Sequence, residues 1–441
     1  MAALTRKDSA PQARKPSLIG ETVRLSGSIL VGLLAGLVLQ VWTLAFLGRL
    51  GSEALYIRAI YAPVGFLVLA VTEGLVVAAQ VSAGIATRNG RRDVLRSSPT
   101  HIAVGGGVLL LTAAVFAAGS DVVFGVLGVE ARNRSGVVAF VVAVCLTSVV
   151  SLLPYVGGAA LRGMGRAGAS SLLSVGFTLL TMAATASLNA VTGLGVLAVP
   201  IGTLVAGAVV GAVAGVLLRE HLPQVSKPWL RRDAVVELRS FGAPVAATFL
   251  LLSSVNFGYL WVLRDAGTAE IAGFGLGQNA TSFFTVVALA VGSGAAVAVN
   301  LRPGEDRRPI NSAGLTATVQ VALPAYAVIG ALAYLLRHPL AGMLTSDQAI
   351  AAIAADYFLW TGPTFALFGG TLALLTYLEQ IGRASAAFTL NMAYFAVLLA
   401  VALCLPPPVG STTLARLLAA GNIVGFATCW YCARHLIRRA R

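Results

Sequence analysis

Long runs of apolar residues alternate with short polar segments along almost the whole chain. The runs are about 20 residues or longer, which is the length that an α-helix needs to cross the hydrocarbon core of a bilayer. They cover residues 26–47, 57–85, 100–118, 136–158, 169–190, 194–218, 240–263, 271–300, 313–336, 350–377, 385–405 and 413–433. The pattern predicts an all-α polytopic membrane protein with twelve transmembrane helices.

One short motif between apolar runs occurs twice. Leu161–Ala169 has the sequence Leu-Arg-Gly-Met-Gly-Arg-Ala-Gly-Ala, and Leu378–Ala386, 217 positions later, has Leu-Glu-Gln-Ile-Gly-Arg-Ala-Ser-Ala. Unpaired backbone and charge are costly in hydrocarbon, so both copies are predicted to be hinge loops at a membrane surface. The expected hinge residues are Gly163, Gly165, Arg166, Gly382 and Arg383. An internal duplication of this kind is common in secondary transporters.

A similar offset relates polar positions near the start of each half. An offset of 216 pairs Gln40 with Asn256 and Thr43 with Tyr259, and it also pairs Gly51 with Gly267. Because polar residues recur at matching places in two otherwise apolar helices, we expect these positions to be functional. The two halves are therefore predicted to be related by an internal repeat.

The charges indicate a membrane topology. The chain has a net charge of +14, and if both termini are cytoplasmic, 24 of its 31 lysines and arginines fall on the cytoplasmic side. This asymmetry follows the positive-inside rule and supports an even number of spans. The basicity is thus a topology signal, and no nucleic-acid partner is expected. Arginine far exceeds lysine and Ala, Gly and Val are abundant, which is typical of a high-GC bacterial source. We therefore expect the chain in a bacterial cytoplasmic (inner) membrane.

The chain lacks the usual patterns of enzymes and nucleotide-binding proteins. No Gly-x-x-x-x-Gly-Lys-Ser/Thr occurs, so no P-loop nucleotide site is expected. No metal-ligand spacing and no nucleophile–base pattern is visible, and the four cysteines lie in or at the ends of apolar runs. We therefore expect no enzyme activity, no metal site and no cofactor other than a transported H⁺ or Na⁺.

Glu73 is the acid that we place well inside a predicted span. A charge near the bilayer centre costs about 2.5–3.5 kcal/mol on insertion scales, so such a residue is a functional candidate. Desolvation favours the neutral carboxyl, which can take up and release a proton. Gln80 and Gly84 follow seven and eleven residues later and share its helical face. The alternative is a buried acid that hydrogen-bonds a neighbouring helix for structural reasons. Thr181 and Thr185, one helical turn apart, are weaker candidates because such hydroxyls usually bond to backbone carbonyls.

Four stretches resemble the multidrug and toxic compound extrusion (MATE) family, within the wider multidrug/oligosaccharidyl-lipid/polysaccharide flippase group. They are Gly48–Leu55, Glu73–Gln80, Leu161–Gly165 and Leu378–Gly382. The resemblance implies two six-helix bundles around a central cleft, which exchange cation influx for substrate export. On that basis we expect a cytoplasmic tail (1–24), an N-terminal bundle (25–219), a cytoplasmic linker (220–239), a C-terminal bundle (240–434) and a basic cytoplasmic tail (435–441).

The sequence also departs from the family. Many members have an acid where Thr43 stands, and the family's Asn and Asp of the fifth helix fall on Thr181 and Thr185. A sodium site built from those groups is therefore not expected here. Some members have an acid–Gly pair where Glu73-Gly74 stands, which leaves Glu73 as the coupling candidate.

We therefore expect a secondary active exporter of amphiphilic small molecules, monomeric in the lipid bilayer, with proton rather than sodium antiport. Glu73 is the cation-coupling residue, and the residues expected to line the cleft are Gln40, Thr43, Gln80, Thr181, Thr185, Asn256 and Tyr259. One alternative is a flippase for a lipid-linked glycan. Another is a major facilitator type transporter, which Arg88–Asp93 resembles weakly; a membrane-embedded transferase lacks an acid–base or metal constellation.

Overall fold

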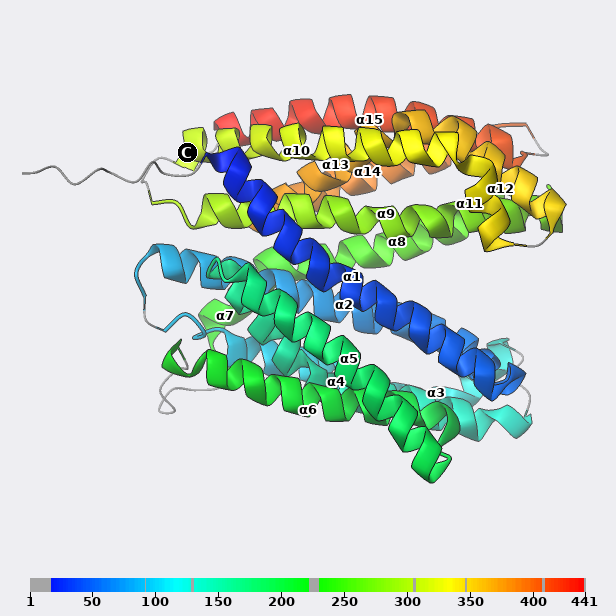
Figure 1. The fold of residues 1–441 in the computed structure, drawn as a ribbon, viewed down its shortest axis with the longest axis horizontal. Helices are drawn as coiled ribbons and strands as arrows, with labels where there is room; N and C mark the ends of the chain where they lie inside the picture. Colours follow the sequence, from blue (N-terminus) through cyan, green and yellow to red (C-terminus); the bar gives the residue numbers. More distant parts are fainter. Residues whose placement is uncertain are drawn as a thin grey trace, which may run out of the picture.

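A computed structural model shows a long bundle of helices (Figure 1). The structure describes residues 17–91, 93–127, 131–221, 230–303, 307–345, 347–406 and 409–439. Within these residues the α-helices are α1 (Leu18–Leu50), α2 (Ser52–Arg88), α3 (Ser98–Leu127), α4 (Ala131–Gly163), α5 (Ala167–Thr192), α6 (Ala198–Leu217), α7 (Arg232–Glu237), α8 (Ala243–Val262), α9 (Thr268–Asn300), α10 (Arg307–Leu335), α11 (Arg337–Leu344), α12 (Gln348–Thr361), α13 (Phe365–Leu378), α14 (Ala384–Leu403) and α15 (Ser411–Arg439).

The all-α, twelve-span prediction is confirmed. The described residues contain 11 helical stretches that are long and apolar enough to cross a membrane. One of them, Gln348–Leu403, has 56 residues and contains the two predicted spans 350–377 and 385–405. At about 1.5 Å per residue a bilayer core needs about 20 residues, so this stretch can cross twice. Gly382 interrupts it with a φ of 90°.

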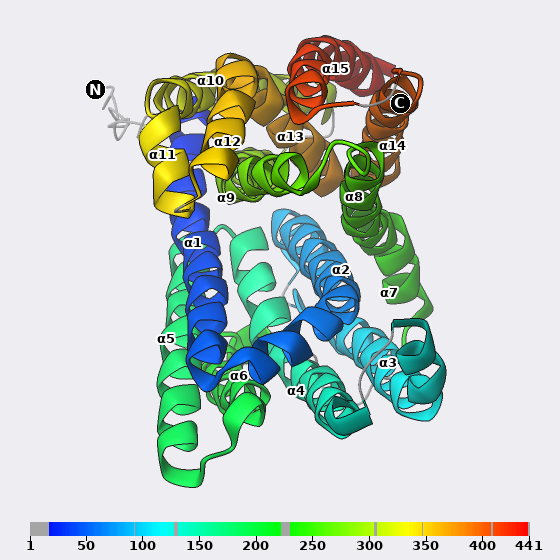
Figure 2. The same cartoon turned by 90° about the vertical axis from the view of Figure 1, so that its right-hand side faces the viewer.

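The helices form two lobes, with α2–α6 in one and α9–α15 in the other (Figures 1 and 2). We call them the N-lobe and the C-lobe. The N-lobe core includes Leu161, Phe177 and Val210. The C-lobe core is more aromatic and includes Tyr326 and Phe358. Van der Waals packing of these side chains against each other holds each lobe together in lipid.

Two helices join the lobes by crossing between them. The first, α1, packs mainly against α9 of the C-lobe and α5 of the N-lobe. Its counterpart in the second half, α8, packs mainly against α2 of the N-lobe and α14 of the C-lobe. Figure 1 shows α1 running diagonally from one lobe to the other. The first helix of each half therefore contacts the opposite lobe.

The N-terminal helix begins earlier than the apolar pattern predicts. The predicted tail reached residue 24, but α1 starts at Leu18, and residues 1–16 lie outside the described part. The Ser17 hydroxyl caps the helix by accepting a hydrogen bond from the Gly20 amide at 3.2 Å. Glu21 in the first turn pairs with Arg302 at the end of α9, with 3.1 Å between Oε2 and Nη2. A cap and an ion pair thus extend the helix into polar sequence.

The start of α1 and the end of α15 lie at the same end of the molecule (Figure 1). The connections α2–α3, α4–α5, α6–α7 and α9–α10 lie there too, because the long helices alternate in direction. These connections and the chain ends carry most of the arginines. We call this end the basic end and the other the opposite end.

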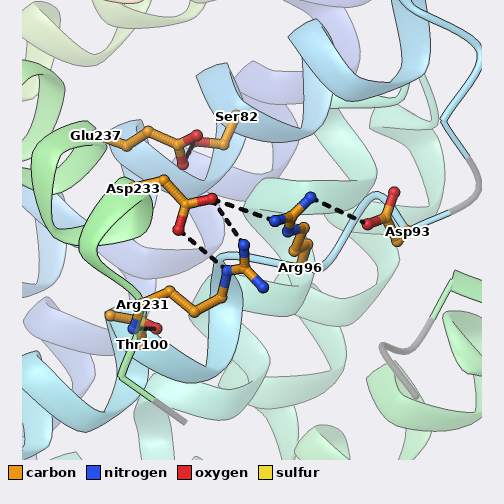
Figure 3. Close-up of polar contacts among 7 residues, drawn as sticks. All are labelled: Ser82, Asp93, Arg96, Thr100, Arg231, Asp233 and Glu237. Carbon is orange, nitrogen blue, oxygen red and sulfur yellow. Dashed lines mark hydrogen bonds and ion pairs between the residues drawn. The ribbon is translucent and has the colours of Figure 1, made fainter. Parts of the chain in front are cut away.

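The linker between the halves is attached to the N-lobe at the basic end (Figure 3). The Asp233 carboxylate pairs with Arg231 at 2.8 Å and with Arg96 at 3.5 Å. The Ser82 hydroxyl donates to Glu237 Oε2 at 2.7 Å, and the Thr100 hydroxyl accepts from the Arg231 amide. These contacts hold the short helix α7 against α2 and α3.

Candidate functional site

A bond between two buried glutamines joins the lobes near the basic end. Gln80 of α2 donates from Nε2 to Oε1 of Gln380, with 2.5 Å between the atoms. Gln380 donates in turn from its Nε2 to the Ser293 hydroxyl of α9 at 2.7 Å. The exposed fractions of Gln80 and Gln380 are 4% and 5%. Buried amides of this kind are costly unless they are paired, so this contact favours one fixed arrangement of the lobes.

Arg162 approaches the same glutamine from the N-lobe. Its Nε donates to Gln80 Oε1 at 3.0 Å, and its Nη1 donates to the Ser170 hydroxyl at 3.2 Å. Its guanidinium also interacts electrostatically with Glu73, which lies seven residues before Gln80 in α2. Glu73 itself is half-buried. A basic and an acidic side chain of the N-lobe therefore lie at the surface that faces the C-lobe.

The C-lobe contributes a second acid to this place. Glu379 is 9% exposed and its side chain is hydrogen-bonded to Thr248 of α8. It also interacts electrostatically with Glu73 of the N-lobe. The Asn300 side chain donates from Nδ2 to the backbone carbonyl of Gln380 at 2.8 Å. We call these residues together the interlobe polar cluster: Glu73, Gln80, Arg162, Ser293, Asn300, Glu379 and Gln380.

Glycines allow the backbones to approach closely here. A Cβ on Gly74 would lie 2.7 Å from the Gly242 carbonyl oxygen, at the crossing of α2 with the start of α8. A Cβ on Gly163 would lie 2.2 Å from the Gln80 carbonyl oxygen. A side chain at either position would force the backbones apart. The cluster therefore depends on small residues as well as on polar ones.

The structure brings the predicted α2 residues together at this interface. Glu73 and Gln80 belong to the interlobe polar cluster, and Gly84 faces Asn300, with 3.4 Å to its Cβ. The shared face that the sequence predicted is thus the face toward the C-lobe. The coupling role of Glu73 stays a prediction.

The two predicted hinges have similar backbones. The first copy is a short loop, Met164–Arg166, in which Gly165 has a φ of 79°. The second copy is a kink between α13 and α14, at Glu379–Arg383, in which Gly382 has a φ of 90°. In each copy one left-handed glycine redirects the chain between two helices. Their role as hinges stays a prediction.

Three predicted cleft residues lie on α1 and α8, toward the opposite end. The side chains of Gln40 and Asn256 are exposed, and Thr43 is half-exposed. Asn256 Oδ1 accepts a hydrogen bond from Gln278 Nε2 at 3.3 Å, and Gln278 Oε1 accepts one from Tyr357 at 2.9 Å. Their exposure on helices that cross between the lobes is compatible with a lining role, which stays a prediction.

Three other candidates lie inside the lobes. Tyr259 is 1% exposed within the C-lobe core, where its ring packs edge-on against Phe274. Thr181 donates to the Phe177 carbonyl at 2.7 Å, which is the structural alternative that the sequence left open. Thr185 is buried at the crossing of α5 with α6, against Gly202. These positions are enclosed by helix packing in this structure, and their predicted role in lining a cleft stays a prediction.

The sequence analysis did not identify Arg162, Glu379 and Gln380 as site residues. A signal was present, because residues 162 and 379 are equivalent positions of the repeated motif and have opposite charges. Ser293 and Asn300 gave no signal beyond their place in α9. Among the described residues, no group of three or more His, Cys, Asp or Glu could hold a metal ion.

The comparison with protein families gives one match. The model of the MatE family matches residues 244–405, which cover most of the C-terminal half. No curated protein sequence matches the chain.

Solved structures are similar over nearly the whole chain. A point mutant of the MATE transporter VcmN from Vibrio cholerae has a TM-score of 0.88 at 18% identity, over 96% of this chain and 98% of that one. An outward-facing multidrug resistance MATE family transporter of the MOP superfamily has 0.84 at 16%, over 96% and 97%. A MOP superfamily transporter from Pyrococcus furiosus, with a binding pocket described as having reverse polarity, has 0.81 at 15%, over 96% of each chain.

Proposed function

We propose that this chain is a MATE transporter, since the MatE model matches residues 244–405 and MATE structures share its fold over 96% of its length, and that it is a proton-coupled exporter of amphiphilic small molecules. The basic end is the cytoplasmic end, so both termini are cytoplasmic, as the positive-inside rule favours. The protein works as a monomer in a bacterial cytoplasmic membrane. The fold argues against the major facilitator alternative.

The observation that carries this proposal is the interlobe polar cluster. It joins two lobes by bonds between buried side chains, Gln80 to Gln380 and Gln380 to Ser293. It also places Glu73 where the lobes meet. In alternating access one lobe rocks against the other, so a carboxyl at their contact changes its surroundings in every cycle. The change in hydration between the closed and open states is what would couple a proton to the motion.

The conformation is consistent with such a cycle. The described bonds between the lobes lie near the basic end, and the chain has a TM-score of 0.84 to a transporter solved in an outward-facing conformation. We assign the structure to the state that is closed to the cytoplasm. Rocking to the inward-facing state then requires the interlobe polar cluster to separate.

Proton coupling is favoured over sodium coupling by the chemistry of the residues. Sodium, like other hard cations, prefers a cage of several oxygen ligands, whereas an enclosed carboxyl is suited to carry a proton. Thr181 bonds its own helix, and Thr185 is packed against Gly202, so neither supplies a carboxylate. Glu73 is the group that we assign to proton transfer.

Efflux from proteoliposomes tests this function. Vesicles loaded with an amphiphilic fluorescent dye are exposed first to a proton gradient and then to a sodium gradient. We expect the proton gradient to drive efflux, and Glu73→Gln to lose it while the exposed Glu220→Gln control retains it. Full activity of Glu73→Gln would remove the coupling role. No efflux under either gradient would favour a flippase for a lipid-linked glycan.

A further inference from the structure

We propose that the helical segment 232–242, which leads from the linker into α8, binds anionic phospholipid headgroups of the membrane through Arg232 and Arg239. The two arginines share an exposed face with two valines. We call this face the linker face: Arg232, Val235, Val236 and Arg239. Its binding of lipid is independent of the coupling ion and of the substrate in the proposed function.

The segment has two unlike faces. One is turned to the N-lobe, where Ala234 is fully buried and Glu237 accepts a hydrogen bond from the Ser82 hydroxyl at 2.7 Å. The other is the linker face, whose residues follow the spacing i, i+3, i+4 and i+7 of one side of a helix. Its two valines, Val235 and Val236, are 43% and 56% exposed. The first face holds the segment on the N-lobe and leaves the linker face free.

The charges are divided between these faces. Asp233 is exposed, but its carboxylate pairs with Arg231 at 2.8 Å and with Arg96 at 3.5 Å (Figure 3). Among the described residues, by contrast, neither Arg232 nor Arg239 has a hydrogen bond, an ion pair or a ring contact. The acids of the segment are thus bonded to the protein, and the linker face presents two positive charges that the protein does not neutralise.

The length of the helix places the linker face at the membrane surface. Arg232–Val262 is one continuous apolar stretch of 31 residues, and its last 20 residues are α8. At about 1.5 Å per residue α8 is about 30 Å long, which matches the hydrocarbon core, whereas the whole stretch is about 46 Å long. Figure 2 shows α7 displaced sideways from α8 toward α3, at the edge of the molecule. Residues 232–242 therefore lie beyond the core, in the layer of lipid headgroups.

The side chains of the linker face match that layer. A guanidinium presents a planar fork of donors that binds phosphate oxygens, and valines can enter the boundary between headgroups and acyl chains. Water would solvate the arginines but would leave the valines uncovered. Because the two charges are both positive, an anionic headgroup is favoured over one without net charge. A mixed basic and apolar face at this depth therefore points to an anionic lipid surface.

The bound lipid would lie beside the contact between the lobes. The turn Leu238–Gly242 joins α7 to α8 and packs against α2 of the N-lobe and α14 of the C-lobe. Phe241 of this turn would lie 3.4 Å from a Cβ placed on Gly382. Lipid on the linker face thus restrains an element that both lobes contact.

The test measures which lipid lies beside the linker face. Ser240 is exposed and is not part of that face, so Ser240→Cys can carry an environment-sensitive fluorophore after the four native cysteines are replaced. Nanodiscs contain equal parts of phosphatidylglycerol, which is anionic, and phosphatidylcholine, which has no net charge. In each sample one of the two lipids is brominated near its headgroup. Bromine quenches the fluorophore on contact, so the ratio of the two quenching efficiencies reports the local preference for anionic lipid.

We expect phosphatidylglycerol to be preferred by up to about 30-fold, because each arginine near an anionic surface contributes about fivefold. Arg232→Gln and Arg239→Gln should each lower the preference by up to about fivefold, and the double variant should abolish it. Arg438→Gln is the matched control, because Arg438 is also exposed at the basic end but belongs to α15. Equal quenching by both lipids in the parent, a preference that the double variant keeps, or an equal loss in Arg438→Gln would overturn the proposal.

Two further results separate a lipid surface from other surroundings. Inorganic phosphate should lower the preference no more than chloride does at the same ionic strength, because both salts only screen the charges. A greater loss with phosphate would indicate a site for small anions and would overturn the assignment to lipid. A fluorophore that neither brominated lipid quenches would show that the linker face lies in water, with the same consequence.

A second measurement covers the case in which the cysteine-free protein does not fold. Native mass spectrometry of the native-cysteine protein, delipidated in detergent and titrated with phosphatidylglycerol, counts the bound lipid molecules. The double variant Arg232→Gln with Arg239→Gln should weaken the tightest binding by up to about 30-fold, whereas Arg438→Gln should not. Unchanged binding in the double variant overturns the proposal. Neither measurement involves transport, so both can fail while proton-driven efflux is observed.

Discussion

The two copies of the repeated motif have the same kind of sequence but make different contributions to the lobe contact. In the first copy Arg162 is followed by Gly163, which lies against the Gln80 backbone. In the second copy Glu379 is followed by Gln380, whose side chain reaches Gln80 in the other lobe. A base and a glycine on one side thus face an acid and an amide on the other.

The difference shows how a duplicated fold acquires a specific contact. Identical copies at these positions would bring like charges together, or would leave two glycines without a bond across the lobes. The divergent copies supply opposite charges, at Arg162 and Glu379. The second copy also supplies the Gln380 side chain, and Gly163 of the first copy leaves space for the Gln80 backbone. Meanwhile the glycine with left-handed φ is retained in both, as Gly165 and Gly382. The duplication preserved the turn and changed the chemistry.

The largest effect is expected from making the two copies alike in charge. Arg162→Glu places three carboxyls at the contact without their cation, and removing the partner of a buried charge costs about 3–5 kcal/mol. Proton-driven dye efflux should fall by more than about 100-fold. The double exchange Arg162→Glu with Glu379→Arg restores one cation and should recover part of the activity. A double variant as inactive as the single one would contradict charge pairing between the copies.

A smaller effect is expected from removing the space that the first copy provides. Gly163→Ala puts a Cβ against the Gln80 carbonyl and should lower the free energy of unfolding by about 2–3 kcal/mol, as overpacking does. Thermal unfolding in detergent measures it. Gly168→Ala is the matched control, because a Cβ there meets nothing within 4 Å. Equal stability of the two variants would show that the close approach at Gly163 is not required.

The shared turn also allows a comparison of the two copies. Alanine at a left-handed position costs about 1–2 kcal/mol, so both Gly165→Ala and Gly382→Ala should be destabilising. A Cβ at 165 would also lie 2.6 Å from Leu301 Cδ1, whereas one at 382 would meet Phe241 at 3.4 Å. Gly165→Ala should therefore have the lower unfolding temperature. The reverse order would indicate that the second copy tolerates a side chain at its glycine less well than the first copy does.

The smallest effect is expected from removing an ion pair that is exposed to solvent. Asp233→Asn removes the ion pairs of the linker with Arg231 and Arg96. The Asp233 side chain is 55% exposed, so the loss of stability should stay below about 1 kcal/mol. Dye efflux should be nearly unchanged. A loss comparable to that of Arg162→Glu would mean that the linker, and not the lobe contact, controls the motion.

Much of the fold could be predicted from the sequence, because the long hydrophobic runs mark the helices that cross the bilayer. The ends of the helices follow less well, since α1 is extended by the local Ser17 cap and by the Glu21–Arg302 pair, which joins residues that are far apart in the chain. Within the site, Glu73 and Gln80 stand out as polar residues in an apolar helix. Glu379 does not, because an acid beside a glycine turn has the appearance of a surface residue. Its burial depends on the packing of α8, which the local sequence does not encode.

The first helix of each half contacts the opposite lobe, and this has a consequence for biosynthesis. The ribosome makes α1 first, but its main partner, α9, begins about 250 residues later, at Thr268. At about 5–20 residues per second, α1 waits roughly 12–50 s in the membrane before it can pack against α9, although its other main partner, α5, is made sooner. During that interval the α9-facing residues of α1 face lipid or the insertion machinery. Mutations that weaken α1 should therefore reduce the yield of inserted protein even where the finished molecule tolerates them.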